Sequence, residues 1–270
     1  MKIILNNTDL NKALENIKLL GFVPTMGFLH NGHVSLIKKS KKICKKTIVS
    51  IFINPTQFNN KNDFKKYPKN LNNDLKILKK NKVDFVYIPK VKDIYNFKRK
   101  VKIKINSNDQ ILCAKFRKNH FEGVLDVMDR FVKIIKPIKI FMGEKDFQQI
   151  YLVKKFIEQK YKSKIISCKT IRDEENLPLS SRNFLLSKTD ISNARNVSQE
   201  LIKLKRQFKI KKIPKNFLLN KKKNLEKEFK IKIDYLELRK LKNLYNSKKI
   251  LNSRFFIAYH INHVRLIDNF

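Results

Sequence analysis

The stretch "VPTMGFLHNGH", residues 23–33, decides how this chain folds. An apolar run ends near Thr25, and a helical pattern begins near Gly32 and continues to Cys44. His30 and His33 therefore flank a turn between a strand and a helix. A helix N-terminus carries unpaired N–H groups and partial positive charge, and imidazoles add further donors. The stretch predicts a phosphate-binding turn, and its alternative is two surface histidines.

Short β-branched or aromatic runs alternate with helical patterns along residues 1–171. The clearest helical pattern spans 121–136, with its apolar residues on one face and Pro137 as a stop. Strands followed by helices predict a parallel sheet covered on both faces, with ligands at the carboxyl ends of its strands. The expected strands are 21–25, 47–53, 83–89, 138–142 and 164–171.

The sequence pattern changes near Arg172. A polar loop comes first, followed by Lys-rich helical stretches and two further strands. The chain therefore predicts an α/β fold: a doubly wound parallel sheet in residues 1–171 and a smaller α+β domain in 172–270. The expected elements of the second domain are helices at 188–205 and 214–229 and strands at 231–238 and 254–261.

The charge is the most unusual feature of the composition. A formal net charge of +39 is typical of nucleic-acid-binding proteins, but only ten of the 62 basic residues are Arg, and the Lys residues are spread along the whole chain. We therefore expect no specific nucleic-acid partner, and a basic nucleic-acid-binding protein stays an alternative. The three Cys residues form no C-x-x-C pair and are expected to be buried thiols. Without an apolar stretch long enough for a membrane span or a secretory segment, a cytoplasmic location is expected.

Six sequence blocks, in order, carry a family resemblance. "PTMGFLHNGHVSLI" resembles the signature of the H-x-G-H nucleotidyltransferase superfamily, and most closely that of the pantothenate synthetase (pantoate:β-alanine ligase) family. The other blocks are "SIFINPTQFNNKNDFKKYP" (50–68), "HFEGVLDVMDR" (120–130), "FMGEKDFQQ" (141–149), "LPLSSRN" (177–183), and "YLELR" with "RLIDN" near the C-terminus.

Two of these blocks have a direct physical interpretation. In "GEKD", Lys145 stands beside a second helix N-terminus and suits ATP phosphates, while Asp146 can accept ribose hydroxyls. In "SSR", two hydroxyls and the Arg182 guanidinium lie at the domain boundary, where a mobile loop can close on a triphosphate. Solvated turns are the alternative for both.

The resemblance implies a Rossmann-like nucleotide- and pantoate-binding domain, a C-terminal lid domain and a homodimer. It implies ATP-dependent condensation of pantoate with β-alanine through a pantoyl adenylate, with release of pyrophosphate and AMP. An alternative is another H-x-G-H nucleotidyltransferase that acts on a phosphorylated substrate. The implied catalytic residues are His33, as proton donor, with His30, Lys145 and Arg182. The implied ATP-binding residues are Met26, Gly27, His30, Gly32, His33, Gly143, Glu144, Lys145, Asp146, Ile171, Leu179, Ser180, Ser181 and Arg182.

The resemblance assigns pantoate and β-alanine to Gln57 and Gln149, whose amides can both donate and accept hydrogen bonds. It also implies Mg²⁺, although the sequence departs from the family there. Where the family usually has an acidic pair, this chain reads Asn-Asn-Asp, which leaves Asp74 as the candidate metal ligand. A second departure replaces Asp-Gly-Leu-Ala by Glu175-Asn-Leu-Pro178. Asn176 tolerates the left-handed conformation, so the turn is expected to persist.

Overall fold

The computed structural model describes residues 1–59, 61–96, 103–208 and 212–270. These residues form two compact units. The first comprises Met1–Ser107 and Arg117–Ile171, and the second comprises Asn108–Phe116 and Arg172–Phe270. The segment Asn108–Phe116 thus belongs to the second unit, although it lies within the range 1–171 expected for the first domain.

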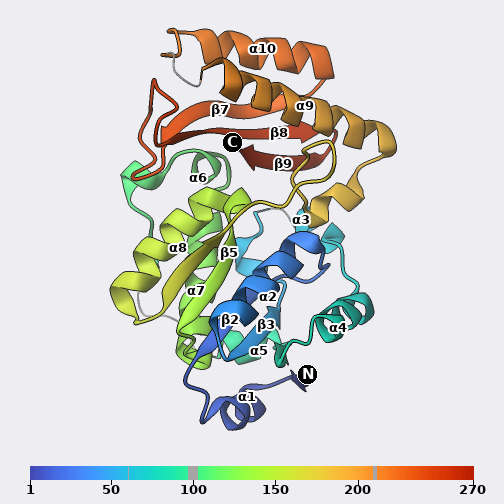
Figure 1. Cartoon of the computed structure of the whole chain (residues 1–270), viewed down its shortest axis with the longest axis vertical. Coiled ribbons are helices and arrows are strands. Elements are labelled where there is room, and N and C mark those ends of the chain that lie inside the picture. The colour runs from blue at the N-terminus through green and yellow to red at the C-terminus, as the bar shows by residue number, and fades with distance from the viewer. Residues whose placement is uncertain (60, 97–102, 209–211) are drawn as a thin grey trace. The chain divides into compact units, whose positions relative to one another are not determined.

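A parallel sheet forms the centre of the first unit (Figure 1). Its strands are ordered β1-β4-β3-β2-β5-β6, and every neighbouring pair is parallel. Because β2 has β3 on one side and β5 on the other, the strand order reverses between β2 and β5. Ligands of open α/β sheets bind at such a switch point, beyond the carboxyl ends of the strands. The strands are β1 (Lys2–Ile4), β2 (Leu20–Thr25), β3 (Lys46–Ile51), β4 (Phe85–Tyr87), β5 (Lys139–Gly143) and β6 (Lys164–Cys168).

Neighbouring residues of a strand point to opposite faces of the sheet. Because both residues of such a pair are apolar here, helices cover both faces. Phe22 of β2 packs on Phe131 of α7 with ring centroids 5.4 Å apart. Its neighbour Val23 is buried in a separate cluster with Leu36 and Ile37 of α2. The helices of this unit are α1 (Asn7–Leu14), α2 (Asn31–Ile43), α3 (Lys61–Lys66), α4 (Leu71–Lys80), α5 (Val91–Ile94), α7 (His120–Ile135) and α8 (Phe147–Lys160), with the 3₁₀ turns η1 (Pro55–Gln57) and η3 (Glu144–Asp146).

The second unit is built on an antiparallel sheet of order β7-β8-β9. Figure 1 shows α9 and α10 lying along this sheet, and their apolar residues join the strands in one core that includes Leu201, Leu225 and Phe255. The elements are β7 (Lys232–Lys240), β8 (Ser253–Ile261), β9 (Val264–Asn269), α6 (Cys113–Phe116), α9 (Lys188–Gln207), α10 (Phe217–Phe229) and η4 (Ser181–Leu185); η2 (Ser107–Asp109) leads into α6.

The predicted fold class is confirmed: the first unit contains a doubly wound parallel sheet, and the second is a smaller α+β unit. Two strands were not expected. One is β1, whose three residues are too few for a pattern, and the other is β9, where polar and apolar residues alternate at the end of the chain. The expected strand 83–89 is shorter, Phe85–Tyr87. Among the described residues, no helix is both long enough and apolar enough to cross a bilayer.

Candidate active site

The turn after β2 has an unusual backbone held by a distant carboxylate. Gly27 and Phe28 both have positive φ, 80° and 52°, a conformation that L-residues with side chains rarely adopt. Asp74 of α4 is 1% exposed, and its two oxygens accept the N–H groups of Phe28 (2.9 Å) and Leu29 (2.7 Å). Hydrogen bonds to a charged group are among the stronger ones, and these fix the path of the chain into α2.

His30 and His33 belong to the first turn of α2 and cap it with their rings. His30 Nδ1 accepts the N–H of Gly32 (3.1 Å), and His33 Nδ1 accepts the N–H of His30 (3.3 Å). The two ring centroids are 4.1 Å apart. Because both Nδ1 atoms accept, each neutral ring keeps its proton on Nε2.

Electrostatics keep both rings uncharged. Burial, with a contribution from the Lys145 charge, lowers the pKa of His30 from 6.5 to about 4. Burial, together with His30 and Lys145, lowers the pKa of His33 to about 3. At neutral pH the pair therefore offers two Nε2–H donors but no imidazolium, so the expected role of His33 as proton donor is limited to donating a hydrogen bond in this state.

The turn after β5 holds Lys145. Its ammonium group lies 3.4 Å from Asp146 Oδ1, and Glu144 Oε1 accepts a hydrogen bond from the hydroxyl of Ser167 (2.9 Å). A Cβ built on Gly143 meets no atom of the described residues within 4 Å, its two chain neighbours aside, and its φ of −80° suits any residue. The charge of Lys145 acts on both imidazoles, so the structure brings the histidine turn and the Lys145 turn together at the switch point of the sheet.

The turn that carries Gln57 is held from several sides. Asn54, which is 1% exposed, donates to Gln57 Oε1 (3.1 Å) and to the carbonyl of Gly123 (3.2 Å). Gln57 Nε2 lies 3.1 Å from Met26 Sδ, which follows β2. The backbone carbonyl of Gln57 is 2.7 Å from His120 Nδ1. The side chain of Gln57 therefore has a defined orientation beside the histidine turn.

Gly123 has a role that the sequence did not reveal. A Cβ at this position would lie 2.4 Å from the carbonyl oxygen of Thr56, so only glycine lets α7 pack against η1. Sequence patterns also did not identify Asn54, Tyr95 and His120 as residues that hold this turn, although the blocks "NPTQF" and "HFEG" contain Asn54 and His120. Tyr95 donates to Asn54 Oδ1 (2.6 Å). An isolated glycine inside a helical pattern was the one available signal of a close backbone approach.

The remaining expected residues divide between the two units. Gln149 is half-buried near the start of α8 in the first unit, where Ile171 is the last residue. The second unit contains Leu179 and the "SSR" segment. Ser180 Oγ accepts the N–H of Arg182 (3.2 Å) at the start of η4, and Ser181 is buried. Because these residues lie in the other unit, their meeting with the histidines stays a prediction. The Asn176 prediction is confirmed, since its φ is 72°.

Metal ligands are not gathered in the described part of the chain. No group of three or more His, Cys, Asp or Glu side chains there is arranged to hold an ion. Asp74, the expected ligand, already uses both oxygens on backbone N–H groups. Both oxygens of Asp74 thus hold the backbone of the histidine turn, and we assign Mg²⁺ no ligand among the described residues.

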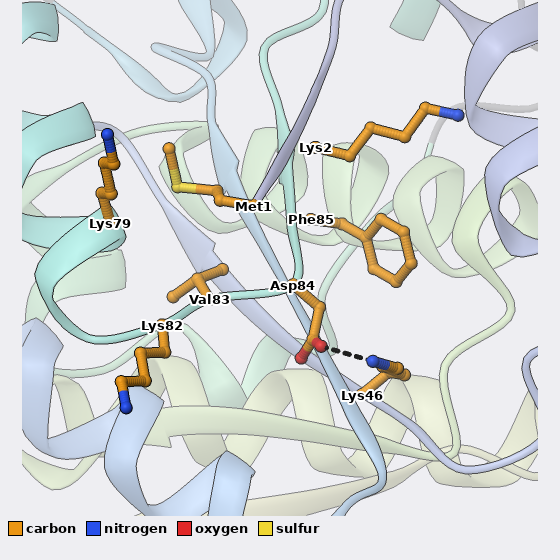
Figure 2. A pocket seen from close by; sticks show the side chains of 8 residues that line it. All are labelled: Met1, Lys2, Lys46, Lys79, Lys82, Val83, Asp84 and Phe85. Carbon is orange, nitrogen blue, oxygen red and sulfur yellow. Dashed lines mark hydrogen bonds and ion pairs between the residues drawn. The ribbon is translucent and has the colours of Figure 1, made fainter.

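A pocket in the first unit lies at the opposite edge of the sheet, where β1, β3 and β4 begin (Figure 2). Lys46 pairs there with Asp84 at 2.8 Å. Figure 2 shows the ammonium groups of Lys2, Lys79 and Lys82 pointing in different directions, so they do not converge on one anion. We assign the candidate site to the carboxyl ends of the strands instead.

Comparison with known proteins shows the family of this chain. The pantoate-beta-alanine ligase family matches residues 2–270. The chain belongs to this family. The pantothenate synthetase of Francisella tularensis subsp. novicida (strain U112) is 41% identical over 271 residues, which cover 97% of this chain and 93% of that relative.

Solved structures show the same fold. The pantothenate synthetase of Thermus thermophilus superposes with a TM-score of 0.93 at 27% identity, covering 100% of this chain and 99% of that one. A pantoate-beta-alanine ligase of Francisella tularensis, crystallised with beta-gamma ATP and beta-alanine, has a TM-score of 0.86 at 38% identity and coverages of 100% and 97%. These likenesses extend over both units of the chain.

Proposed function

We propose that the chain joins pantoate to β-alanine at the expense of ATP, through a pantoyl adenylate, and releases pyrophosphate and then AMP. The observation that carries this proposal is the meeting of two neutral histidines with Lys145 at the switch point between β2 and β5. Family membership supports it, as does the relative crystallised with beta-gamma ATP and beta-alanine.

The proposed chemistry has two steps. A carboxylate oxygen of pantoate attacks the α-phosphorus of ATP, an O–P bond forms, and the bond from phosphorus to pyrophosphate breaks. The amine of β-alanine then attacks the acyl carbon, loses a proton, and expels AMP. Neither step needs a side-chain nucleophile, so the protein contributes positioning and charge stabilisation.

The residues of the first unit have distinct roles in this proposal. His30 and His33 donate Nε2–H hydrogen bonds to phosphate oxygens, and Lys145 balances their growing charge. The space beside Gly143, which the described residues other than its chain neighbours leave open, receives part of the nucleotide, and Asp146 accepts a hydrogen bond from a ribose hydroxyl. Met26, Gly27, Gly32, Glu144 and Ile171 border the same nucleotide.

Gln57 and Gln149 hold pantoate in this proposal. The support for Gln57 is its amide, whose orientation is set by Asn54 and Met26. A phosphorylated acceptor, as in a nucleotidyltransferase, would favour a basic residue in place of either glutamine. The amides therefore favour an uncharged hydroxyl partner.

Residues 172–270, which form most of the second unit, act as the lid in this proposal. Ser180, Ser181 and Arg182 would close on the triphosphate, with Leu179 against the nucleotide. Mg²⁺ would screen the negative charge of the ATP phosphates, and we assign it no protein ligand. Family resemblance alone supports a homodimer in the cytoplasm.

The decisive experiment measures AMP, ADP and pyrophosphate with each substrate omitted in turn. We expect pyrophosphate only when ATP and pantoate are both present, and AMP and pantothenate only when β-alanine is added as well. Pantoate labelled with ¹⁸O in its carboxylate should pass one label to AMP, seen by mass or ³¹P shift. Formation of ADP, with the label in inorganic phosphate, would contradict the adenylate route.

A further inference from the structure

We propose that Asp74 is a positioning residue whose carboxylate holds the turn that aims His30 and His33. This proposal rests on the function proposed above and adds a residue to its machinery. Asp74 lies in the first turn of α4, more than forty residues from the histidines in sequence, yet its oxygens bind two consecutive N–H groups directly before His30. The contact is therefore a long-range link that fixes the backbone directly before His30.

The backbone of the turn explains why it needs an anion. Gly27 and Phe28 are successive residues with positive φ, so the following N–H groups leave the sheet ladder and point to one side. Consecutive N–H groups arranged in this way form a concave site for an anion. Phe28 adopts a conformation that is unfavourable for a residue with a Cβ, and the two hydrogen bonds from the turn to Asp74 offset that cost.

The chemistry at position 74 must be that of a carboxylate. Both partners are donors, and only an ionised carboxylate presents an acceptor to each of them. An amide would turn an NH₂ group towards one N–H. Burial raises the pKa of Asp74, whereas the hydrogen bonds from Leu29 and Phe28 oppose that change. A nearly inaccessible charge is tolerated here because both of its oxygens are satisfied.

A displacement of this turn passes directly to the histidines. Leu29 is buried, which prevents it from absorbing a shift, and His30 is the next residue. Both imidazoles are bound through Nδ1 to backbone N–H groups of the same segment. The Nε2–H donors therefore move with the backbone that Asp74 holds.

The first test compares Asp74→Asn with Asn73→Asp and with the double variant. Asn73 is exposed in the same helical turn, so it supplies a matched control. We expect kcat/KM for ATP to fall about 100-fold in Asp74→Asn, because a small misplacement of catalytic donors has an effect of that order. The KM for pantoate should change less than about 3-fold, and the Mg²⁺ concentration for half-maximal activity should stay unchanged. Asn73→Asp should be active and should not rescue the double variant.

The second test needs no substrate. In ¹⁵N-histidine NMR titrations, the pKa values of His30 and His33 should rise towards 6.5 in Asp74→Asn as the loosened turn admits water. The signals of His260 and His263 serve as internal controls. This readout tests the positioning of the rings even if the wild-type chain forms no AMP, a result that would contradict only the proposed function.

Gly27→Ala reaches the same contact from the other side if Asp74→Asn does not fold. A Cβ there would lie 3.0 Å from Asp74 Oδ2 at a φ of 80°, so the same loss of kcat/KM and the same histidine shifts are expected. Unchanged histidine titrations in a folded Asp74→Asn protein would overturn the proposal. The proposal would also be overturned if Asp74→Asn needed more Mg²⁺ for half-maximal activity and the double variant with Asn73→Asp returned to the wild-type Mg²⁺ requirement. That is the behaviour of a metal ligand.

Discussion

The two turns that meet at the switch point of the sheet differ in how they are held. The turn after β2 is determined by its surroundings: Gly27 has a positive φ, a Cβ there would approach Ile51 and Asp74, and Asp74 binds the two following N–H groups. The turn after β5 begins at Gly143 with a φ of −80°, and an added Cβ there would meet none of the described residues within 4 Å, its chain neighbours aside. One turn is held by contacts within the protein, while the other leaves room for a ligand.

This difference assigns the two turns different tasks. Fixed Nε2–H donors cost little reorganisation when charge develops on a phosphate, which is the requirement for electrostatic stabilisation. The long side chain of a lysine can follow the phosphates as the reaction proceeds. We infer that precision comes from the histidine turn and adaptability from the Lys145 turn.

Removing the ammonium group of Lys145 or the imidazole of His33 should have the largest effect on kcat/KM. Lys145→Ala and His33→Ala should each lower kcat/KM by about 10²- to 10³-fold, because each removes a contact to developing phosphate charge. Coupled AMP formation measures this. Lys154→Ala, an exposed lysine on α8, is the matched control and should retain wild-type activity. Near-wild-type rates in Lys145→Ala or His33→Ala would refute the assigned roles.

Alanine substitutions at Gly27 and Gly143 should affect stability and ATP binding differently, and so distinguish the two turns. Gly27→Ala should lose activity and about 1–2 kcal/mol of stability, because a Cβ is strained at a φ of 80°. Gly143→Ala should keep its stability and raise the KM for ATP about 10-fold, since its methyl group enters the space assigned to the nucleotide. Thermal denaturation and ATP titration measure the two effects. A destabilised Gly143→Ala protein with unchanged KM would contradict the distinction.

A smaller and more selective effect is expected at the Gln57 turn. Gly123→Ala should push η1 away from α7, because its Cβ would lie 2.4 Å from the carbonyl oxygen of Thr56. We expect the KM for pantoate to rise several-fold while the KM for ATP stays constant. Equal changes in both constants would mean that the turn is not specific to pantoate.

The sequence predicted what periodicity and local chemistry encode. The strands around "GFVPT" and the helix at His120–Ile135 follow from apolar patterns, and the left-handed Asn176 follows from its side chain. The histidine turn was recognisable because a strand, glycines and a helix start adjoin in sequence. These features depend on neighbours along the chain.

Long-range partners could not be predicted in this way. Asp74 was the candidate Mg²⁺ ligand because the family usually has an acidic pair at this place, and nothing local indicates that residues 28 and 29 provide its partners. Gly123 was likewise visible only as a glycine in a helix. Its purpose depends on η1, which lies far away in sequence. The segment Asn108–Phe116 belongs to the second unit through contacts such as Cys113 with Tyr235, which no pattern in the segment reveals.

The smallest expected effect is the pH dependence of stability, and it tests whether the two turns interact. The folded pKa values of His30 (about 4) and His33 (about 3) lie below 6.5, so between pH 6.5 and 4 the unfolded chain binds protons that the folded chain does not. Stability must then decrease as the pH falls through this range. For half-buried rings, we expect a loss of about 1–2 kcal/mol each at pH 5 relative to pH 7.5.

Urea unfolding at pH 5 and pH 7.5 measures this loss, and the double variant His30→Asn/His33→Asn corrects for the carboxylates, whose titration is common to both proteins. Lys145→Ala provides the decisive comparison. If the Lys145 charge acts across from the second turn, its removal should raise both histidine pKa values and make the pH dependence shallower. If the free energy of unfolding differs between pH 5 and pH 7.5 by the same amount in Lys145→Ala as in the wild type, burial alone keeps the histidines neutral. The two turns then act independently.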